Sequence, residues 1–151
     1  MFCRQSHSAD GISVALASSS SEWSSIALTE GRAVEPRYGY WTLPAGFMEN
    51  DETAGEAAMR ETVEEAGAHI ELEAAFSMIS VPRVNQVHLF YRARLLDLEF
   101  KPGVESLDVA LMEEAKIPWK DIAFRTVALT LKYWFADRAR GSYGFHAEDI
   151  K

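Results

Sequence analysis

The feature that most constrains this chain is one helix near its middle. Thr53 and Glu56 have the spacing of a capping box, in which two side chains and two backbone N–H groups satisfy one another at the start of a helix. Gly67 is the residue type that ends many helices in a left-handed conformation. The apolar positions between them recur at helical spacing. The sequence therefore predicts a helix that begins at Thr53 and ends at Gly67.

Three acidic residues share one side of this predicted helix. At about 100° per residue, Glu61, Glu64 and Glu65 fall within an arc of about 100°. Carboxylates this close repel one another, and hard oxygen ligands on a rigid helix suit Mg²⁺ or Mn²⁺. An acidic cluster is also often a solvated helix face, and Arg60 has helical spacing to neighbouring glutamates. The cluster alone leaves both interpretations open.

A longer pattern around the helix distinguishes these interpretations. The segment matches G-x5-E-x7-R-E-x-x-E-E-x-G, and chance agreement at all of these positions is about one in a million for a chain of this length. The matching residues are Gly46, Glu52, Arg60, Glu61, Glu64, Glu65 and Gly67. This pattern resembles the Nudix box, the signature of the Nudix hydrolases.

The resemblance implies a fold, a reaction and a set of residue roles. Nudix proteins are α/β/α sandwiches with a mixed sheet, and they hydrolyse a nucleoside diphosphate linked to another moiety. The implied cofactor is Mg²⁺, with Mn²⁺ as an alternative. Carried over by position, the metal ligands would be Glu61, Glu64, Glu65 and the carbonyl of Gly46. The structural positions of the motif would be Glu52, Arg60 and Gly67, of which Glu52 and Arg60 orient the helix and the loop before it.

The general base varies within the family, and the resemblance leaves it open here. One option is a glutamate of the motif, Glu61 or Glu64. The other is a carboxylate on a later loop, where Glu105 and Asp108 follow a predicted turn at residues 101–103. Asp108 is preferred, because residues 108–112 have the character of the strand that usually brings such an acid to the site. Both could also be solvated turn residues.

Features outside the motif are similar to the ADP-ribose and FAD pyrophosphatase branch of the family. Pro82 follows Gly67 by fifteen residues, a spacing associated with ADP-ribose pyrophosphatases, although a proline there also ends strands. The similarity is carried by EPRYGYWTLPAGF, NQVHLFYRARL and PWKDIAF. The expected reaction is hydrolysis of ADP-ribose, FAD or a similar dinucleotide with release of AMP. The alternatives are pyrophosphate release from a nucleoside triphosphate and nucleotide binding without turnover.

Candidate substrate contacts are chosen by residue type. Arg37 and Arg83 present the planar guanidinium that binds phosphates, and Tyr40 could stack on a base. For the aromatic residues, packing in the core is the competing interpretation. His88 lies in a strand-like run and is interpreted as a packed histidine rather than a ligand.

Length and charge fix the remaining expectations. A chain of 151 residues is enough for one domain, here taken as residues 1–151 with residues 1–10 frayed. The net charge of −8 opposes binding to nucleic acid or to an anionic membrane. The single Cys3 excludes an intrachain disulfide and a cysteine-based zinc ribbon. Without a recognisable targeting signal, a cytoplasmic location is expected.

The expected secondary structure is a mixture of strands and two helices. The second helix, over 125–140, is rich in aromatic residues, which either complete the core or form a homodimer interface. The expected strands lie at residues 12–17, 26–28, 41–43, 70–81, 86–98 and 108–112.

Overall fold

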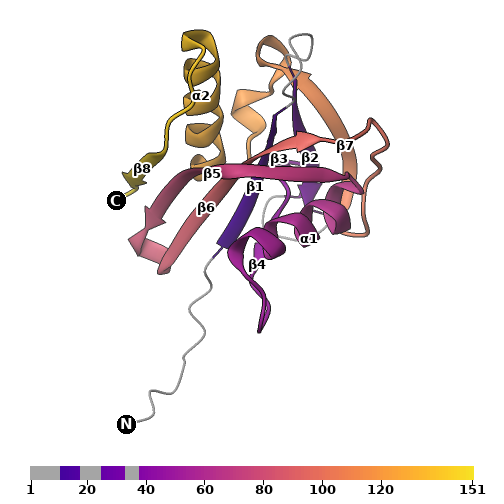
Figure 1. Ribbon diagram of the computed structural model, residues 1–151, viewed down its shortest axis with the longest axis horizontal. Coiled ribbons are helices and arrows are strands. Elements are labelled where there is room, and N and C mark those ends of the chain that lie inside the picture. Colours follow the sequence, from indigo (N-terminus) through magenta and orange to yellow (C-terminus); the bar gives the residue numbers. More distant parts are fainter. Residues whose placement is uncertain (1–10, 18–24, 33–37) are drawn as a thin grey trace.

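One mixed sheet organises the described part of this protein, as seen in the computed structural model (Figure 1). The structure describes residues 11–17, 25–32 and 38–151, with side chains from residue 38 onward. The expectations that fall outside these residues concern residues 1–10, with Cys3 among them, and Arg37.

Within the described residues the sheet has eight strands. They are β1 (Gly11–Ala17), β2 (Ser25–Arg32), β3 (Trp41–Thr42), β4 (Ala45–Phe47), β5 (Ile70–Val81), β6 (Gln86–Leu95), β7 (Ser106–Glu113) and β8 (His146–Asp149). Their order is β3-β2-β1-β6-β5-β8, with β4 paired to β1 and β7 paired to β2. The β1–β6 and β5–β8 pairs are parallel and the others are antiparallel. The predicted mixed sheet is therefore confirmed.

Two α-helices accompany the sheet. They are α1 (Ala54–Ala66) and α2 (Arg125–Arg140), and each is followed by a glycine with positive φ. Both predicted helices are confirmed, since local capping and glycine signals determine their ends. Three short 3-10 turns complete the described structure: η1 (Pro82–Val84), η2 (Glu114–Lys116) and η3 (Trp119–Asp121).

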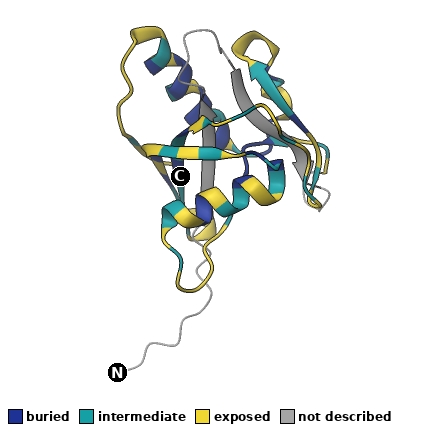
Figure 2. Cartoon of the chain, turned by 45° about the vertical axis from the view of Figure 1, so that its right-hand side comes forward, coloured by how far each residue is buried: buried dark blue, intermediate teal, exposed yellow. Residues whose placement is uncertain are grey.

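The two helices pack on opposite faces of β6. Phe90 joins the apolar cluster of α2, whereas Ala93 joins the cluster of α1. Side chains alternate between the faces of a strand, so residues three apart point in opposite directions. Trp134 and Phe135 are both buried in the α2 cluster, so these aromatic residues complete the core of a single chain. Figure 2 shows buried and exposed residues alternating along α1, as expected for a helix that covers a sheet.

Two strands were not predicted, and several of the predicted strands have other ends in the structure. β6 ends at Leu95, three residues before the predicted end at Leu98. β4 was not predicted, because Pro44 and Gly46 indicate the end of a strand and three residues carry no periodicity. β8 was not predicted either, because its residues are mostly exposed and polar and show no apolar alternation.

A buried carboxylate explains how β8 is held beside β5. Asp137 in α2 is fully buried, and its Oδ2 accepts hydrogen bonds from the backbone N–H of Gly144 and from His146 Nε2, both at 2.8 Å. Its other oxygen forms an ion pair with Arg140. The His146 ring also stacks on Tyr133, with ring centroids 4.4 Å apart. These contacts fix the segment after α2 and so place the last strand.

Neither α1 nor α2, the two α-helices of the described residues, is long and apolar enough to cross a lipid bilayer.

Candidate active site

The start of α1 is fixed by the predicted capping box. The Thr53 side chain accepts a hydrogen bond from the Glu56 N–H at 3.2 Å, and the Glu56 carboxylate accepts one from the Thr53 N–H at 2.8 Å. Gly67 follows the helix with φ of 57°. The helix is therefore rigidly defined at both ends, and its carboxylates occupy a fixed side of the molecule.

Arg60 connects α1 to the loop that precedes it. Its guanidinium donates two hydrogen bonds to Glu52, at 2.8 and 3.1 Å, and one to the carbonyl of Phe47 at 3.0 Å. It also donates to Glu61 at 2.7 Å and to Glu64 at 3.0 Å. The hydrogen bond from Arg60 lowers the pKa of Glu52, and the Glu49 N–H lowers it further. Glu52 and Arg60 thus make the contacts that an orienting role requires.

β4 lies directly against the carboxylates of α1. The Ala45 N–H donates to Glu65 Oε2 at 2.7 Å. A Cβ at Gly46 would lie 2.0 Å from Glu61 Oε1, so any larger residue here would require the Glu61 carboxylate to move. Burial raises the pKa of Glu61; the Arg60 hydrogen bond opposes this shift, and the nearby charge of Glu64 adds to it. The backbone around Gly46 is therefore held within contact distance of two of the predicted ligands.

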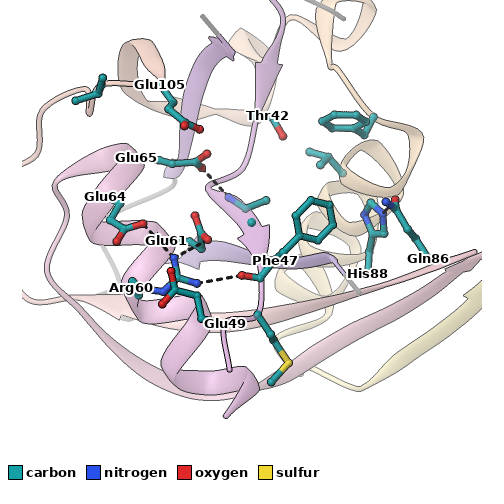
Figure 3. A pocket seen from close by; sticks show the side chains of 16 residues that line it. Thr42, Phe47, Glu49, Arg60, Glu61, Glu64, Glu65, Gln86, His88 and Glu105 are labelled. Carbon is teal, nitrogen blue, oxygen red and sulfur yellow. Dashed lines mark hydrogen bonds and ion pairs between the residues drawn. The ribbon is translucent and has the colours of Figure 1, made fainter. Parts of the chain in front are cut away.

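These elements form one wall of a pocket of about 820 Å³ (Figure 3). Its acidic end contains Glu61, Glu64, Glu65 and Glu105, and Arg60 is the one cationic side chain among the described lining residues. The rest of the described lining consists of Thr42, Ala45, Gly46, Phe47, Met48, Glu49, Gln86, His88, Val104, Phe124 and Val127. The structure thus brings the three predicted glutamate ligands and Gly46 to a single pocket.

The loop that carries Glu105 is attached to the end of α1. The Lys101 N–H donates to the carbonyl of Ala66, and the Gly103 N–H donates to the carbonyl of Glu65, both at 2.9 Å. These carbonyls belong to the last turn of the helix, where no further helical N–H is available to them. The loop therefore satisfies the helix end and at the same time brings Glu105 to the pocket.

The second late acidic residue, Asp108, lies elsewhere. Asp108 is exposed on β7 and is not among the described residues that line the pocket. The reason is strand alternation: Val109 packs in the apolar cluster of α1, so Asp108 points to the other face of the strand. Its Oδ1 accepts the Val109 N–H at 2.8 Å. The placement favours Glu105 over Asp108 as a base, contrary to the preference drawn from the sequence.

Two of the three predicted substrate contacts, Tyr40 and Arg83, do not line the pocket. Tyr40 and Arg83 are exposed, and neither is among the described lining residues. Arg83 lies in the 3-10 turn between β5 and β6, beyond the part of β6 that reaches the pocket. Arg37 lies outside the described residues. These residues were selected for their side-chain chemistry alone, and side-chain chemistry does not show whether a residue lies in a pocket or at an exposed turn.

Two polar residues of β6 line the pocket although the sequence did not single them out for it. Gln86 and His88 alternate along the same face as Phe90, which is buried in the core. His88 contacts Gln86 Oε1 through Nε2 and Thr126 Oγ1 through Nδ1, both at 3.1 Å. Burial lowers the pKa of His88. The signal that was available in the sequence is that Gln86 and His88 are polar although they share a strand face with the apolar Phe90. Such a pattern indicates a cavity beside that part of the strand.

The glutamates fit a divalent cation in their chemistry. Carboxylate oxygens are the ligands that Mg²⁺ and Mn²⁺ take, and Glu61, Glu64, Glu65 and Glu105 offer them in one pocket. In the described residues, however, no three acidic, histidine or cysteine side chains converge closely enough to hold an ion. Arg60 holds two of these carboxylates. The contacts are to Glu61 Oε1 and Glu64 Oε2, so each carboxylate has a second oxygen to offer a cation.

Comparison with known proteins identifies the family. A model of the NUDIX domain matches residues 8–129. The structure of a NUDIX hydrolase from Nitrosomonas europaea is 43% identical with a TM-score of 0.85, over 95% of this chain and 80% of that one. An ADP-ribose pyrophosphatase from Streptococcus suis shares the fold at 19% identity and a TM-score of 0.71, over 95% of this chain and 100% of that one.

A third structure shares the fold at lower identity. It is a bifunctional NMN adenylyltransferase/ADP ribose pyrophosphatase from Francisella tularensis, complexed with AMP and a Mn ion. It is 16% identical with a TM-score of 0.67, over 90% of this chain and 43% of that one. The family match covers most of the chain, and the Nitrosomonas protein is similar in both sequence and structure. This chain therefore belongs to the Nudix family and is a Nudix hydrolase.

Proposed function

We propose that this Nudix hydrolase cleaves the pyrophosphate bond of a nucleoside diphosphate derivative, ADP-ribose or FAD, and releases AMP. The observation that carries the proposal is the gathering of glutamates around one pocket, where Glu61, Glu64, Glu65 and Glu105 form its acidic end. An excess of carboxylates opposes a phosphorylated ligand unless a cation accompanies it. Structural neighbours that act on ADP-ribose, one of them complexed with AMP and a Mn ion, support this substrate class.

The proposed cofactor is Mg²⁺, with Mn²⁺ as a substitute. Enzymes of this family generally use a divalent metal ion. The residues that would hold it are Glu61, Glu64, Glu65 and the carbonyl of Gly46. When bound, such an ion polarises phosphoryl oxygens and lowers the pKa of a coordinated water.

The protein's own residues account for positioning and proton transfer. Arg60 and Glu52 hold the loop before α1 against the helix, which keeps Gly46 beside the glutamates. Glu105 would accept the proton of the attacking water, because it is the late carboxylate that lines the pocket. Water then adds to one phosphorus atom, the bridging P–O bond breaks, and the second phosphate departs with its substituent.

A product assay tests this proposal. The protein is incubated with ADP-ribose, FAD, NADH and dGTP, with Mg²⁺ and then with EDTA, and the products are separated by chromatography. AMP from ADP-ribose or FAD, abolished by EDTA, is the expected result. Pyrophosphate from dGTP alone would instead indicate a nucleoside triphosphate pyrophosphohydrolase. Nucleotide binding without any product would indicate a regulator.

Two further expectations remain predictions: one domain over residues 1–151 and a cytoplasmic location. The sequence left the oligomeric state open, with a homodimer as one of the alternatives. The aromatic residues considered for a dimer interface are packed in the core, so a dimer would need another surface. Size-exclusion chromatography with light scattering measures this directly.

A further inference from the structure

The end of the pocket away from the glutamates has a different chemistry. Figure 3 shows the Phe47 side chain between Glu61 and His88, with Gln86 beside His88. Phe47, the last residue of β4, is 54% exposed, which is unusual for a large aromatic side chain. Its backbone carbonyl accepts a hydrogen bond from Arg60, so its position is tied to the glutamate end of the same pocket. Phe47 thus offers a flat apolar surface inside the pocket.

A chain of hydrogen bonds determines how Gln86 is oriented. Oε1 of Gln86 can only accept a hydrogen bond, so His88 Nε2 must carry the proton between them. Burial lowers the pKa of His88, which favours the neutral ring, and Nδ1 of a neutral ring is then an acceptor for the Thr126 hydroxyl. Thr126 is 3% exposed in the first turn of α2. The chain therefore runs from Thr126 through His88 to Gln86.

This chain leaves one group of Gln86 for a ligand. Its carbonyl oxygen is taken by His88, and among the described residues no hydrogen bond is recorded to its amide nitrogen. The amide nitrogen carries two N–H donors, and Gln86 is half-buried at the pocket. Two fixed donors beside an exposed phenyl ring fit a planar ring that bears hydrogen-bond acceptors.

The distribution of charge in the pocket indicates which part of a nucleotide each end would bind. The cationic lining residue Arg60 is engaged by Glu52, Glu61 and Glu64, so it is not available to a phosphate at the opposite end. Phosphates therefore suit the glutamate end, where a cation can offset their charge. Phe47, Gln86 and neutral His88 suit an uncharged group.

We propose that Phe47 and Gln86 form the binding site for the heteroaromatic ring of the substrate. Thr126 and His88 are positioning residues, which act by orienting the amide of Gln86. The proposal rests on the proposed function, because it assigns the two ends of one pocket to the two parts of a nucleotide. It adds that recognition of the ring depends on stacking and on one side-chain amide.

Calorimetric binding of two small probes in Mg²⁺ tests this site. AMP carries an aromatic ring, whereas ribose 5-phosphate carries the same sugar phosphate without one. Wild-type protein is expected to bind AMP roughly tenfold or more tightly than ribose 5-phosphate, as stacking on an aromatic side chain implies. Phe47→Leu and Gln86→Leu should each weaken AMP binding by roughly tenfold. Both should leave the affinity for ribose 5-phosphate unchanged.

Matched variants separate the ring site from general damage. Phe145→Leu removes a phenylalanine that is 56% exposed and is not among the described lining residues, so it should bind both probes as wild type does. Thr126→Val removes the hydroxyl at nearly constant volume and should weaken AMP alone by about threefold or more. Thr126→Ser restores the hydroxyl and should restore AMP binding. Near-ultraviolet circular dichroism checks that each variant is folded.

The outcomes are distinct. Equal binding of AMP and ribose 5-phosphate by the wild type would overturn the ring site, as would unchanged AMP binding in folded Phe47→Leu and Gln86→Leu. If Phe47→Leu does not fold, Gln86→Leu decides the matter, because this half-buried side chain leaves the core intact. Turnover of ADP-ribose with unchanged AMP binding in the variants would refute the ring site and leave the proposed function standing. A ring preference without turnover would refute the proposed function alone.

Discussion

Gly103 lies so close to Glu64 that a Cβ on Gly103 would be 1.7 Å from the Glu64 carbonyl oxygen. No side chain fits in that space, and the contact is to backbone that belongs to the last turn of α1. Two residues later in the same loop, Glu105 enters the pocket. The absence of a side chain at Gly103 thus determines how closely the loop can approach the helix that carries the other glutamates.

Gly103→Ala is therefore expected to reduce catalysis. The added methyl group must push the loop from α1 and displace Glu105, and kcat should fall by about tenfold to a hundredfold with a small change in KM. If Gly103 acts through Glu105, the double variant Gly103→Ala/Glu105→Gln should have a kcat only slightly below that of Glu105→Gln alone. Gly144→Ala is the control, because nothing lies within 4 Å of a Cβ built there. If instead the two fold-losses in kcat multiply in the double variant, Gly103 does not act through Glu105.

Glu65→Gln should keep the fold and remove most of the activity. The amide oxygen of glutamine can still accept the Ala45 N–H, so the contact with β4 is preserved while one negative charge is lost. With a metal ligand weakened, kcat is expected to fall at least about a hundredfold. Glu114→Gln, at an exposed residue that is not among the described lining residues, should behave as wild type. Retained activity in folded Glu65→Gln would remove Glu65 from the metal site.

The two candidate bases can be compared directly. Glu105→Gln should lower kcat by about a hundredfold or more with little change in KM, whereas Asp108→Asn should leave both parameters near those of the wild type. The physical reason is that Glu105 lines the pocket and Asp108 points away from it. Steady-state kinetics with ADP-ribose gives both values. The reverse result would return the role of base to Asp108 or to a glutamate of α1.

The buried carboxylate of Asp137 should make stability depend on pH. Burial raises its pKa, but the hydrogen bonds from His146 and Gly144 outweigh this and leave the pKa below its ordinary value. A depressed carboxyl pKa stabilises the fold above the unfolded value, near pH 4, and this stabilisation is lost as the pH falls further. The thermal unfolding midpoint, Tm, is measured as a function of pH. Below about pH 4, the Tm of the wild type should fall more steeply with decreasing pH than the Tm of Asp137→Asn.

The same residue should matter at neutral pH. Asp137→Asn removes the charge that faces Arg140 and His146 and should lower the free energy of unfolding by about 2–4 kcal/mol. Urea unfolding followed by tryptophan fluorescence measures this, since Trp134 is buried in the α2 cluster. Asp149→Asn, an exposed change in β8, is the control. A stability within about 0.5 kcal/mol of the wild type would show that this network does not hold the C-terminal segment.

The parts of the fold that could be predicted from the sequence are those set by local signals. The start of α1 depends on Thr53 and Glu56, three residues apart, and its end on Gly67. The common placement of the glutamates follows from helical geometry. By contrast, β4 pairs with β1 more than thirty residues earlier, and β8 pairs with β5 more than sixty residues earlier. Neither relationship is encoded within a short window of sequence.

The candidate site divides in the same way. The motif residues of α1 and Gly46 were predicted together and the structure brings them together. Arg83 and Tyr40 were chosen by residue type, and Asp108 was chosen by the family resemblance. The placement of all three depends on which face of a strand or turn they occupy. Gln86 was not predicted because its role depends on how β6 and α2 meet.

The rate of AMP formation from ADP-ribose tests the central claim most directly. It is measured in Mg²⁺ for the wild type, Glu64→Gln and Glu114→Gln, with an EDTA control for each. We expect wild type and Glu114→Gln to release AMP at equal rates, Glu64→Gln to be slower by at least about a hundredfold, and EDTA to abolish the reaction. AMP release that continues in EDTA, or at an undiminished rate in folded Glu64→Gln, would contradict the account of a metal-dependent site on α1.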